Sequence, residues 1–440
     1  DIWQIQNGKE KLVLNLSKAN SIVTSRDELI ALTIENNIIY IYKNQNKLCT
    51  IQLADDVKSM EFSPLTNFLS VLTYQEKSDN FYVFRLSDQK QLFSGRKFVS
   101  KTTNIDHQPF LVQFSADESK ICMQKQHIIQ YLDQEMQPIE GQFIQFFKPS
   151  EKYTQVSYQF AGDHVVVACP VTKNTGGKIC AYLQNEYVCG YTNQKVARFQ
   201  FQVSNKYCLV KLLFDDGSNY YGGAQLLMLN FPQKTTRIMN KEFLNAFCIH
   251  KQLQTEIIVV SYGNPCTLEF NYVTFHQQSN SLIVKTEIYK HKVYINAMQS
   301  QNNVLVLRGE AGMDGQIYIG IFTSNKIKII AKKLQRDITH VDILQNAVLF
   351  STQKPRFQVD NSFYINDFGF KTQQKLVFDG LRYLNVLGSK SNLIQIEQFD
   401  KMSEVDIEAA EQKVAQADVY VPPQARKQPT QQNTQTRSGG

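Results

Sequence analysis

The feature of this sequence that most constrains its fold is a recurring pair of short apolar or alternating segments. Examples are LIALTI with NIIYIYK, FLSVLTY with FYVFRLS, and KICMQ with HIIQYLD. Short runs of this kind, bounded by polar turn residues, are typical of β-strands joined as hairpins. The same pairing continues in HVVVACP/KICAYLQ, KYCLVKLLF/AQLLMLNF, EIIVVSYG/CTLEFNYV, NVLVLRG/QIYIGIF and NAVLFSTQ/SFYINDF. No convincing amphipathic helix precedes residue 400.

The interval between these pairs indicates a repeat architecture. Units of roughly 35–50 residues with a few strands each are typical of propeller blades. A local repeat supports this interpretation, because EFSPLTNFLSVL (61–72) aligns with QFSADESKICMQ (113–124), and TSRDELIALTI (24–34) is a weaker third copy. Eight blades are predicted to begin near residues 20, 57, 110, 153, 196, 243, 293 and 338. A chain of several β-sandwiches is the alternative, and the regular interval disfavours it.

The sequence therefore predicts an all-β fold, a single large β-propeller over residues 1–400 with nine blades. The ninth blade would combine RYLNVLG and NLIQIEQF with the N-terminal DIWQIQ, which closes the ring and removes exposed sheet edges. A short helix is expected over 401–417, where SEVDIEAAEQKVAQA begins with a potential N-cap, Ser403. Residues 418–440, rich in Gln, Pro and Thr, are expected to form an extended or disordered tail.

Composition narrows the chemistry that this chain can perform. The eight cysteines form no C-x-x-C pair and the seven histidines show no metal-ligand spacing, so no metal site is expected. His127 is interpreted as a structural residue, and Asp55–Asp56 and Asp215–Asp216 as turn residues. We find no nucleophile motif, and expect no catalytic residues, no cofactor and no enzymatic activity. Reduced thiols and the lack of a long apolar run lead us to expect a cytoplasmic monomer that does not bind membranes, although the start at Asp1 leaves a removed leader open.

The segment GSNYYGGA (217–224) carries two glycines at the spacing of a phosphate-binding loop. The lysine and hydroxyl of that motif are replaced by Gly223 and Ala224, and a P-loop must open a helix. We therefore predict a hairpin, with strand KYCLVKLLF, a turn, and strand AQLLMLNF. Gly222 and Gly223 suit a β-bulge or a close approach of the backbone.

Basic clusters are the remaining candidates for a binding site. The net charge is +7, a mild excess that permits an acidic partner such as RNA. In KIKIIAKKLQR (326–336), Lys326 and Lys328 are predicted on one strand face, and Lys332, Lys333 and Arg336 in a loop between blades. These five side chains are the predicted RNA contacts, with PQKTTR (232–237) and YKHK (289–292) as smaller clusters. Ordinary charge on an edge strand is the alternative interpretation.

Four ordered segments, with EFSP at 61–64 as a weaker fifth, give the chain a resemblance to the eukaryotic translation initiation factor 2A family. The family's D-x-x-x-x-S-Y-Y-G-E-like segment is matched by SNYYGG, through Tyr220, Tyr221 and Gly222. Its V-Y-G-F-x-P-A stretch is similar to VSYGNPCTLEFN, with Tyr262, Gly263 and Pro265. The other two segments are KPRFQVDNSFYI and YVPPQAR, through Pro355, Arg356, Val359, Asp360, Asn361, Tyr420, Pro422, Pro423 and Arg426.

The resemblance implies a nine-bladed WD-repeat-like propeller and a translation initiation factor without GTPase activity. It implies binding to the small ribosomal subunit, through ribosomal RNA and ribosomal proteins, and a role in initiator tRNA delivery and in translation regulation. Initiator tRNA, mRNA and other initiation factors are then the further expected partners. Two alternatives remain: a scaffold similar to subunit b of initiation factor 3, and a propeller hydrolase.

Overall fold

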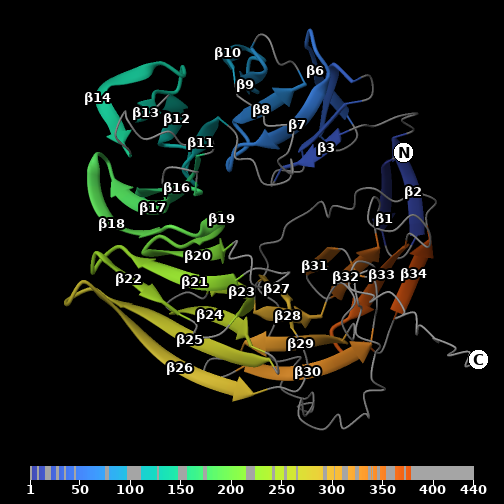
Figure 1. The fold of residues 1–440 in the computed structure, drawn as a ribbon. Helices are drawn as coiled ribbons and strands as arrows, with labels where there is room; N and C mark the ends of the chain where they lie inside the picture. The colour runs from blue at the N-terminus through green and yellow to red at the C-terminus, as the bar shows by residue number, and fades with distance from the viewer. Residues whose placement is uncertain are drawn as a thin grey trace, which may run out of the picture. The chain divides into compact units, whose positions relative to one another are not determined.

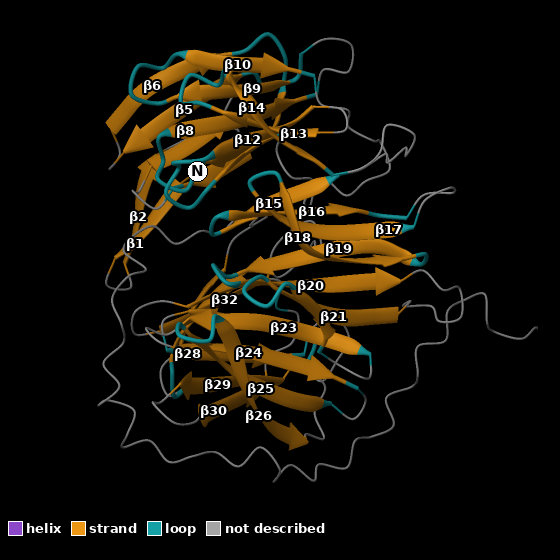
Figure 2. Ribbon diagram, turned by 90° about the vertical axis from the view of Figure 1, so that its left-hand side faces the viewer, coloured by secondary structure: helices purple, strands orange, loops and turns teal. Residues whose placement is uncertain are grey.

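The computed structural model describes the strands and turns that make up most of the chain. The described residues are 2–6, 9–14, 21–25, 29–33, 36–43, 46–74, 79–96, 111–125, 128–146, 156–171, 176–214, 223–239, 243–251, 255–263, 266–290, 295–301, 303–309, 316–322, 327–334, 338, 340–343, 347–352, 362–370 and 373–377. The chain divides into two units, Asp1–Val405 and Asp406–Gly440, and the described residues all belong to the first. In the described residues the only regular elements are strands (Figures 1 and 2).

A four-stranded antiparallel sheet recurs eight times, and we number these sheets 1 to 8 in chain order. Sheet 1 contains β3 (Ser21–Thr24), β4 (Leu29–Thr33), β5 (Ile38–Lys43) and β6 (Asn46–Gln52). Sheet 2 contains β7 (Val57–Phe62), β8 (Phe68–Thr73), β9 (Phe81–Arg85) and β10 (Gln91–Gly95). Sheet 3 contains β11 (Val112–Phe114), β12 (Ile121–Lys125), β13 (Ile128–Leu132) and β14 (Pro138–Gln145). Sheet 4 contains β15 (Ser157–Ala161), β16 (His164–Cys169), β17 (Gly177–Leu183) and β18 (Glu186–Asn193).

The second half of the chain repeats the pattern. Sheet 5 contains β19 (Val196–Val203), β20 (Tyr207–Phe214), β21 (Gly223–Asn230) and β22 (Thr235–Ile238). Sheet 6 contains β23 (Leu244–Lys251), β24 (Thr255–Tyr262), β25 (Thr267–His276) and β26 (Ser281–Lys290). Sheet 7 contains β27 (Ala297–Gln301), β28 (Val304–Arg308), β29 (Gln316–Phe322) and β30 (Ile327–Leu334). Sheet 8 contains β31 (His340–Ile343), β32 (Ala347–Thr352), β33 (Ser362–Asp367) and β34 (Gln373–Val377).

The predicted strand pairs are confirmed in every sheet. All eight hairpins expected from the sequence form the second and third strands of sheets 1 to 8, in antiparallel register. The first strands begin at positions 21, 57, 112, 157, 196, 244, 297 and 340, within a few residues of the predicted blade starts. Consecutive four-stranded meanders of this kind are the blades of a β-propeller.

The expected ninth blade stays a prediction. The N-terminal strand β1 (Ile2–Gln6) pairs with β2 (Lys9–Leu14) in a separate two-stranded sheet. Residues 381–400, which were expected to complete that blade, lie outside the described residues. The predicted helix over 401–417 and the tail over 418–440 also lie outside them.

Neighbouring sheets pack on each other through apolar side chains. Ile39 and Ile41 of sheet 1 form one buried cluster with Leu69 and Val71 of sheet 2. Corresponding clusters join sheets 2 and 3, 3 and 4, 4 and 5, 5 and 6, and 7 and 8. Burial of one such side chain contributes roughly 1.5–3 kcal/mol, so the stacking of consecutive sheets is the main source of stability.

The turn between the first and second strands has a serine that explains the sequence repeat. In sheet 2 the Ser63 Oγ accepts a hydrogen bond from the Phe68 N–H at 2.9 Å. In sheet 3 the Ser115 Oγ accepts one from the Lys120 N–H, also at 2.9 Å. In sheet 1 the Ser25 Oγ accepts one from the Leu29 N–H at 3.1 Å. The aligned segments therefore share one turn geometry, in which a serine closes the loop onto the next strand.

Polar side chains also connect these turns between sheets. The buried Glu118 carboxylate of sheet 3 accepts hydrogen bonds from the Leu65 N–H at 2.5 Å and the Asn67 Nδ2 at 2.8 Å, both in sheet 2. The Ser204 Oγ of sheet 5 donates to the Glu256 carboxylate of sheet 6 at 2.6 Å. These bonds fix the order and spacing of neighbouring sheets at one end of the first strands.

Candidate functional site

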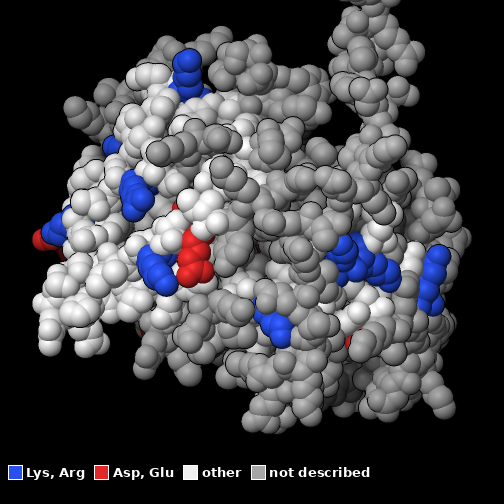
Figure 3. All heavy atoms as spheres, turned by 90° about the horizontal axis from the view of Figure 1, so that it is seen from below, with Lys and Arg blue, Asp and Glu red and all other residues white. Residues whose placement is uncertain are grey.

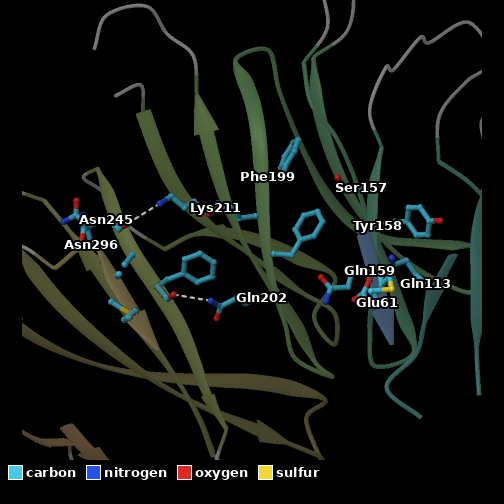
Figure 4. Close-up of a pocket in the computed structure, with 17 residues that line it drawn as sticks. Glu61, Gln113, Ser157, Tyr158, Gln159, Phe199, Gln202, Lys211, Asn245 and Asn296 are labelled. Carbon is cyan, nitrogen blue, oxygen red and sulfur yellow. Dashed lines mark hydrogen bonds between the residues drawn. The ribbon is translucent and has the colours of Figure 1, made fainter. Parts of the chain in front are cut away.

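A cavity of about 770 Å³ is lined by the first strands of six consecutive sheets. Its walls come from β7, β11, β15, β19, β23 and β27, together with Lys211 of β20 and Asn296 just before β27 (Figure 4). The first strand of each sheet is paired on one side only, with the second strand. The cavity therefore lies where the unpaired edges of the first strands converge, at the centre of the propeller. We call it the central cavity.

Carboxamide side chains dominate the polar lining of the central cavity. They are Gln113, Gln159, Gln200, Gln202, Asn245 and Asn296, and the charged side chains are Glu61 and Lys211. Glu61, Gln113 and Gln159 lie on one wall in Figure 4, and Lys211, Asn245 and Asn296 on the opposite wall. Phe199 borders the space between them in Figure 4, and Phe201 also lines the cavity.

Two of these polar groups hold neighbouring sheets together. The Lys211 Nζ donates to the Asn245 carbonyl oxygen at 3.2 Å, and burial lowers the pKa of Lys211. The Gln202 Nε2 donates to the Phe247 carbonyl at 3.2 Å, while its Oε1 accepts from the Ile249 N–H at 2.9 Å. Lys211 and Gln202 thus join sheet 5 to sheet 6, and their polar atoms are already engaged in structural bonds.

The predicted RNA contacts are divided between strand β30 and undescribed residues. Lys328, Lys332 and Lys333 all lie in β30, the fourth strand of sheet 7. The prediction that Lys332 and Lys333 lie in a loop between blades is wrong, because the ladder with β29 continues to Gln316↔Leu334. Lys326 and Arg336 lie outside the described residues, so their placement stays a prediction.

The three described lysines of β30 differ in their surroundings. Lys332 is exposed and Lys328 is half-buried. The Lys333 Nζ donates to the Asn366 Oδ1 of sheet 8 at 3.0 Å and lies 5.7 Å from the Phe370 ring centroid. Desolvation by burial lowers the pKa of Lys333, against a smaller raising effect of Tyr364. Lys333 therefore has a structural role between sheets 7 and 8, and Lys332 is the side chain of the three that is open to a partner.

Charge is distributed unequally along the chain. Residues 21–193, which contain sheets 1 to 4, carry 16 Lys and Arg against 18 Asp and Glu. Residues 194–377, which contain sheets 5 to 8, carry 21 Lys and Arg against 12 Asp and Glu. The positive charge is thus concentrated in the second half of the chain. Residues 194–377 carry a net charge of +9, and residues 21–193 a net charge of −2.

The fourth strands show the same contrast at the surface. Each fourth strand of sheets 5 to 8 carries an exposed cation: Arg237 in β22, Lys285 in β26, Lys332 in β30 and Lys375 in β34. We call these four the outer-strand cations. In sheets 3 and 4 the corresponding strands carry exposed Glu140 and Glu186 instead. On the face drawn in Figure 3, the described Lys and Arg side chains predominate over Asp and Glu.

The hairpin predicted around GSNYYGGA is present. Strands β20 and β21 pair without interruption from Tyr207↔Asn230 to Phe214↔Gly223. Gly223 and Ala224 thus begin a strand, whereas a phosphate-binding loop requires a helix at this point. The register is continuous, so Gly223 forms no bulge; a Cβ there would lie 3.4 Å from the Phe214 ring.

Most segments that carry the family resemblance lie outside the described residues. The markers outside them are Tyr220, Tyr221, Gly222, Pro265, Pro355, Arg356, Val359, Asp360, Asn361, Tyr420, Pro422, Pro423 and Arg426. His127 and Asp215–Asp216, which were interpreted as a structural residue and as turn residues, also lie outside the described residues. Of the remaining markers, Tyr262 ends β24, Gly263 follows it with φ +78°, and EFSP includes the serine turn of sheet 2.

The cysteines are packed as small apolar side chains. All eight are free, seven are buried, and Cys49 is partly buried.

In the described ranges, no group of three or more His, Cys, Asp and Glu is arranged to hold a metal ion. Those ranges also contain no helix with the length and apolar character of a membrane span.

The central cavity was not predicted from the sequence. Its lining residues run from Met60 to Met298 and come together only when consecutive sheets stack. The one local signal is FQFQ (199–202), in which glutamines replace the apolar residues that usually alternate with Phe in a buried strand.

Comparison with known proteins shows a similarity in fold. No family model and no curated protein matches the sequence. A solved structure described as a eukaryotic initiation factor matches with a TM-score of 0.65 at 18% identity, covering 84% of this chain and 91% of that one. Two further structures, the dihydro-heme d1 dehydrogenase NirN and the hydrazine synthase of Kuenenia stuttgartiensis, match with TM-scores of only 0.45 and 0.36, at 10% and 8% identity. These two alignments cover 82% and 85% of this chain, and 76% and 99% of the other chain. At these TM-scores we infer nothing about this protein from them. The resemblance inferred from the sequence is thus confirmed at the level of the fold, since this chain is similar in fold to a eukaryotic initiation factor.

Proposed function

We propose that this protein is a non-enzymatic translation initiation factor that binds the small ribosomal subunit in the cytoplasm. The observation that carries the proposal is the fold likeness to an initiation factor over 84% of the chain. The ordered sequence segments that resemble the initiation factor 2A family support it independently. The role in initiator tRNA delivery, without GTP hydrolysis, is proposed from that same resemblance.

The outer-strand cations are the proposed ribosomal RNA contacts. Lys and Arg side chains bind nucleic acids chiefly through phosphates, and each such interaction releases condensed counterions. Four consecutive fourth strands, β22, β26, β30 and β34, each supply one exposed cation. Contacts of this kind bind the phosphate backbone and require no base-specific geometry. Lys328 and the predicted Lys326 and Arg336 would extend the binding surface around β30.

Co-sedimentation with purified small subunits tests this proposal. The variant Lys332→Glu/Lys375→Glu should bind more weakly at moderate salt, and the dependence of binding on salt should become shallower by about one unit for each phosphate that the variant no longer binds. Lys47→Glu provides a matched control, because Lys47 is an exposed lysine on β6, the fourth strand of sheet 1. Equal binding of the wild type and both variants at all salt concentrations would rule out a role of the outer-strand cations in RNA binding. Failure of the wild type to sediment with small subunits would rule out the proposed function itself.

A further inference from the structure

The central cavity contains polar groups that the fold itself does not use. Within the described part of the chain, the carboxamides of Gln159 and Gln200 make no hydrogen bond with another residue, although both border the cavity. Gln159 lies on β15 and Gln200 on β19, the first strands of neighbouring sheets. Gln202, two residues along β19, uses both of its side-chain polar atoms to bind sheet 6. One glutamine of this strand is therefore structural, and the other is available to a ligand.

Glutamine side chains specify a particular kind of ligand. Each carboxamide presents a carbonyl acceptor and an N–H donor side by side, which is the complement of a peptide group. Two such groups border the cavity on adjacent strands and offer hydrogen bonds. Phe199 and Phe201 also line the cavity and offer an apolar contact, on the face of β19 opposite to Gln200 and partly packed against the core of sheets 4 and 5. A volume near 770 Å³ is within the range of ordinary ligand sites.

The charges of the cavity disfavour nucleic acid. Glu61 and Lys211 are the charged residues that line it, and they have opposite signs. The Lys211 ammonium already donates to the Asn245 carbonyl oxygen. A nucleic acid strand would bring phosphates into a space without surplus positive charge, whereas a peptide backbone is neutral.

We propose that the central cavity binds an extended peptide segment of a partner protein. The carboxamides of Gln159 and Gln200 hydrogen-bond to its backbone, and one apolar side chain of the segment packs on Phe199 and Phe201. This site is distinct from the outer-strand cations, and it does not depend on ribosome binding.

Selection from a phage-displayed library of random linear peptides tests the proposal. We expect the wild-type protein to enrich peptides with a central apolar residue. Synthetic versions of these peptides should bind the variant Gln159→Leu/Gln200→Leu at least about tenfold more weakly, because the variant removes both carboxamides that hydrogen-bond to the peptide. Gln225→Leu is the matched control, because Gln225 lies on β21 of the same sheet 5 but does not line the cavity. It should bind the peptides as the wild type does.

A labelling experiment gives a second readout that does not depend on the double variant. Gln200→Cys introduces a thiol at the cavity, whereas seven of the eight native cysteines are buried. A bound peptide should slow maleimide labelling of this thiol several-fold. The proposal is overturned if no peptide is enriched, if enriched peptides bind both glutamine variants equally, or if labelling is unaffected. It is also overturned if single-stranded oligouridylate, rather than peptide, protects the thiol.

Discussion

His250 should make the stability of this protein depend on pH. The ring lies between sheets 6 and 7, stacked on Phe322 with ring centroids 3.6 Å apart and an interplanar angle of 10°. Its Nδ1 lies 2.6 Å from the Ser300 Oγ, and its Nε2 is buried without a hydrogen-bond partner among the described residues. Burial lowers the pKa of His250 from 6.5 to about 4. The folded protein therefore holds a neutral imidazole under conditions in which the unfolded chain is protonated.

The sign and size of the effect follow from this difference. Above pH 6.5 the imidazole is neutral in both states, and the stability is fully present. As the pH falls from 6.5 towards 4, the unfolded state binds a proton that the folded state does not, and stability is lost. One pKa unit corresponds to about 1.36 kcal/mol, so His250 alone should lower the free energy of unfolding by about 2 kcal/mol between about pH 7 and pH 5.

Urea unfolding at about pH 7 and pH 5, followed by circular dichroism, measures this loss. The substitution His250→Gln removes the titrating group and should reduce the loss of stability between the two pH values by about 2 kcal/mol, whatever its effect at neutral pH. His276→Gln is the control, because His276 is exposed at the end of β25. If wild type and His250→Gln lost the same free energy between the two pH values, the assignment of a buried neutral imidazole would be refuted.

Three further substitutions test the contacts between and within sheets by thermal unfolding. Glu118→Ala removes the acceptor of the Leu65 and Asn67 hydrogen bonds and should lower the free energy of unfolding by about 1–3 kcal/mol. An unchanged unfolding temperature would show that this link between sheets 2 and 3 is not stabilising. Gly190→Ala places a Cβ 2.6 Å from the Ile179 carbonyl oxygen and should lower the free energy of unfolding by about 1–3 kcal/mol. Gly223→Ala is the control, because its Cβ would lie 3.4 Å from the nearest atom, and it should lower the free energy of unfolding clearly less. Lys333→Met removes the hydrogen bond to Asn366 between sheets 7 and 8 and should lower the free energy of unfolding by about 1 kcal/mol. Lys332→Met is the control, because Lys332 is exposed on the same strand, and it should leave stability unchanged.

The strand pairs could be predicted because their signal is local. The second and third strands are apolar or alternating runs, because neighbouring sheets bury them against each other. LIALT of β4, for example, is buried at every position. Polar residues mark the turns, and the serine of EFSP and QFSA makes the same hydrogen bond in both copies. Eight sheets and their starting points follow from these features without any knowledge of distant contacts.

The candidate sites were less predictable, for two physical reasons. The end of β30 carries AKKL, a charged sequence that favours a loop, but a fourth strand has one unpaired edge where lysine is well tolerated. The strand therefore continues through Lys332 and Lys333. That the Lys333 ammonium is engaged by Asn366 could not be inferred, because the two residues belong to different sheets.

The sequence by itself determined the all-β class, the order of the strands and the interval of the repeat, because alternation and turn chemistry act between residues close in the chain. Only the tertiary structure decided which polar side chains are free to bind. Gln200 and Gln202 are identical in type and two positions apart, yet sheet 6 approaches closely enough to engage Gln202 through Phe247 and Ile249, while Gln200 makes no such bond to the described strands. That distinction depends on the stacking of one sheet on the next, which brings together residues some 45 positions apart in the chain.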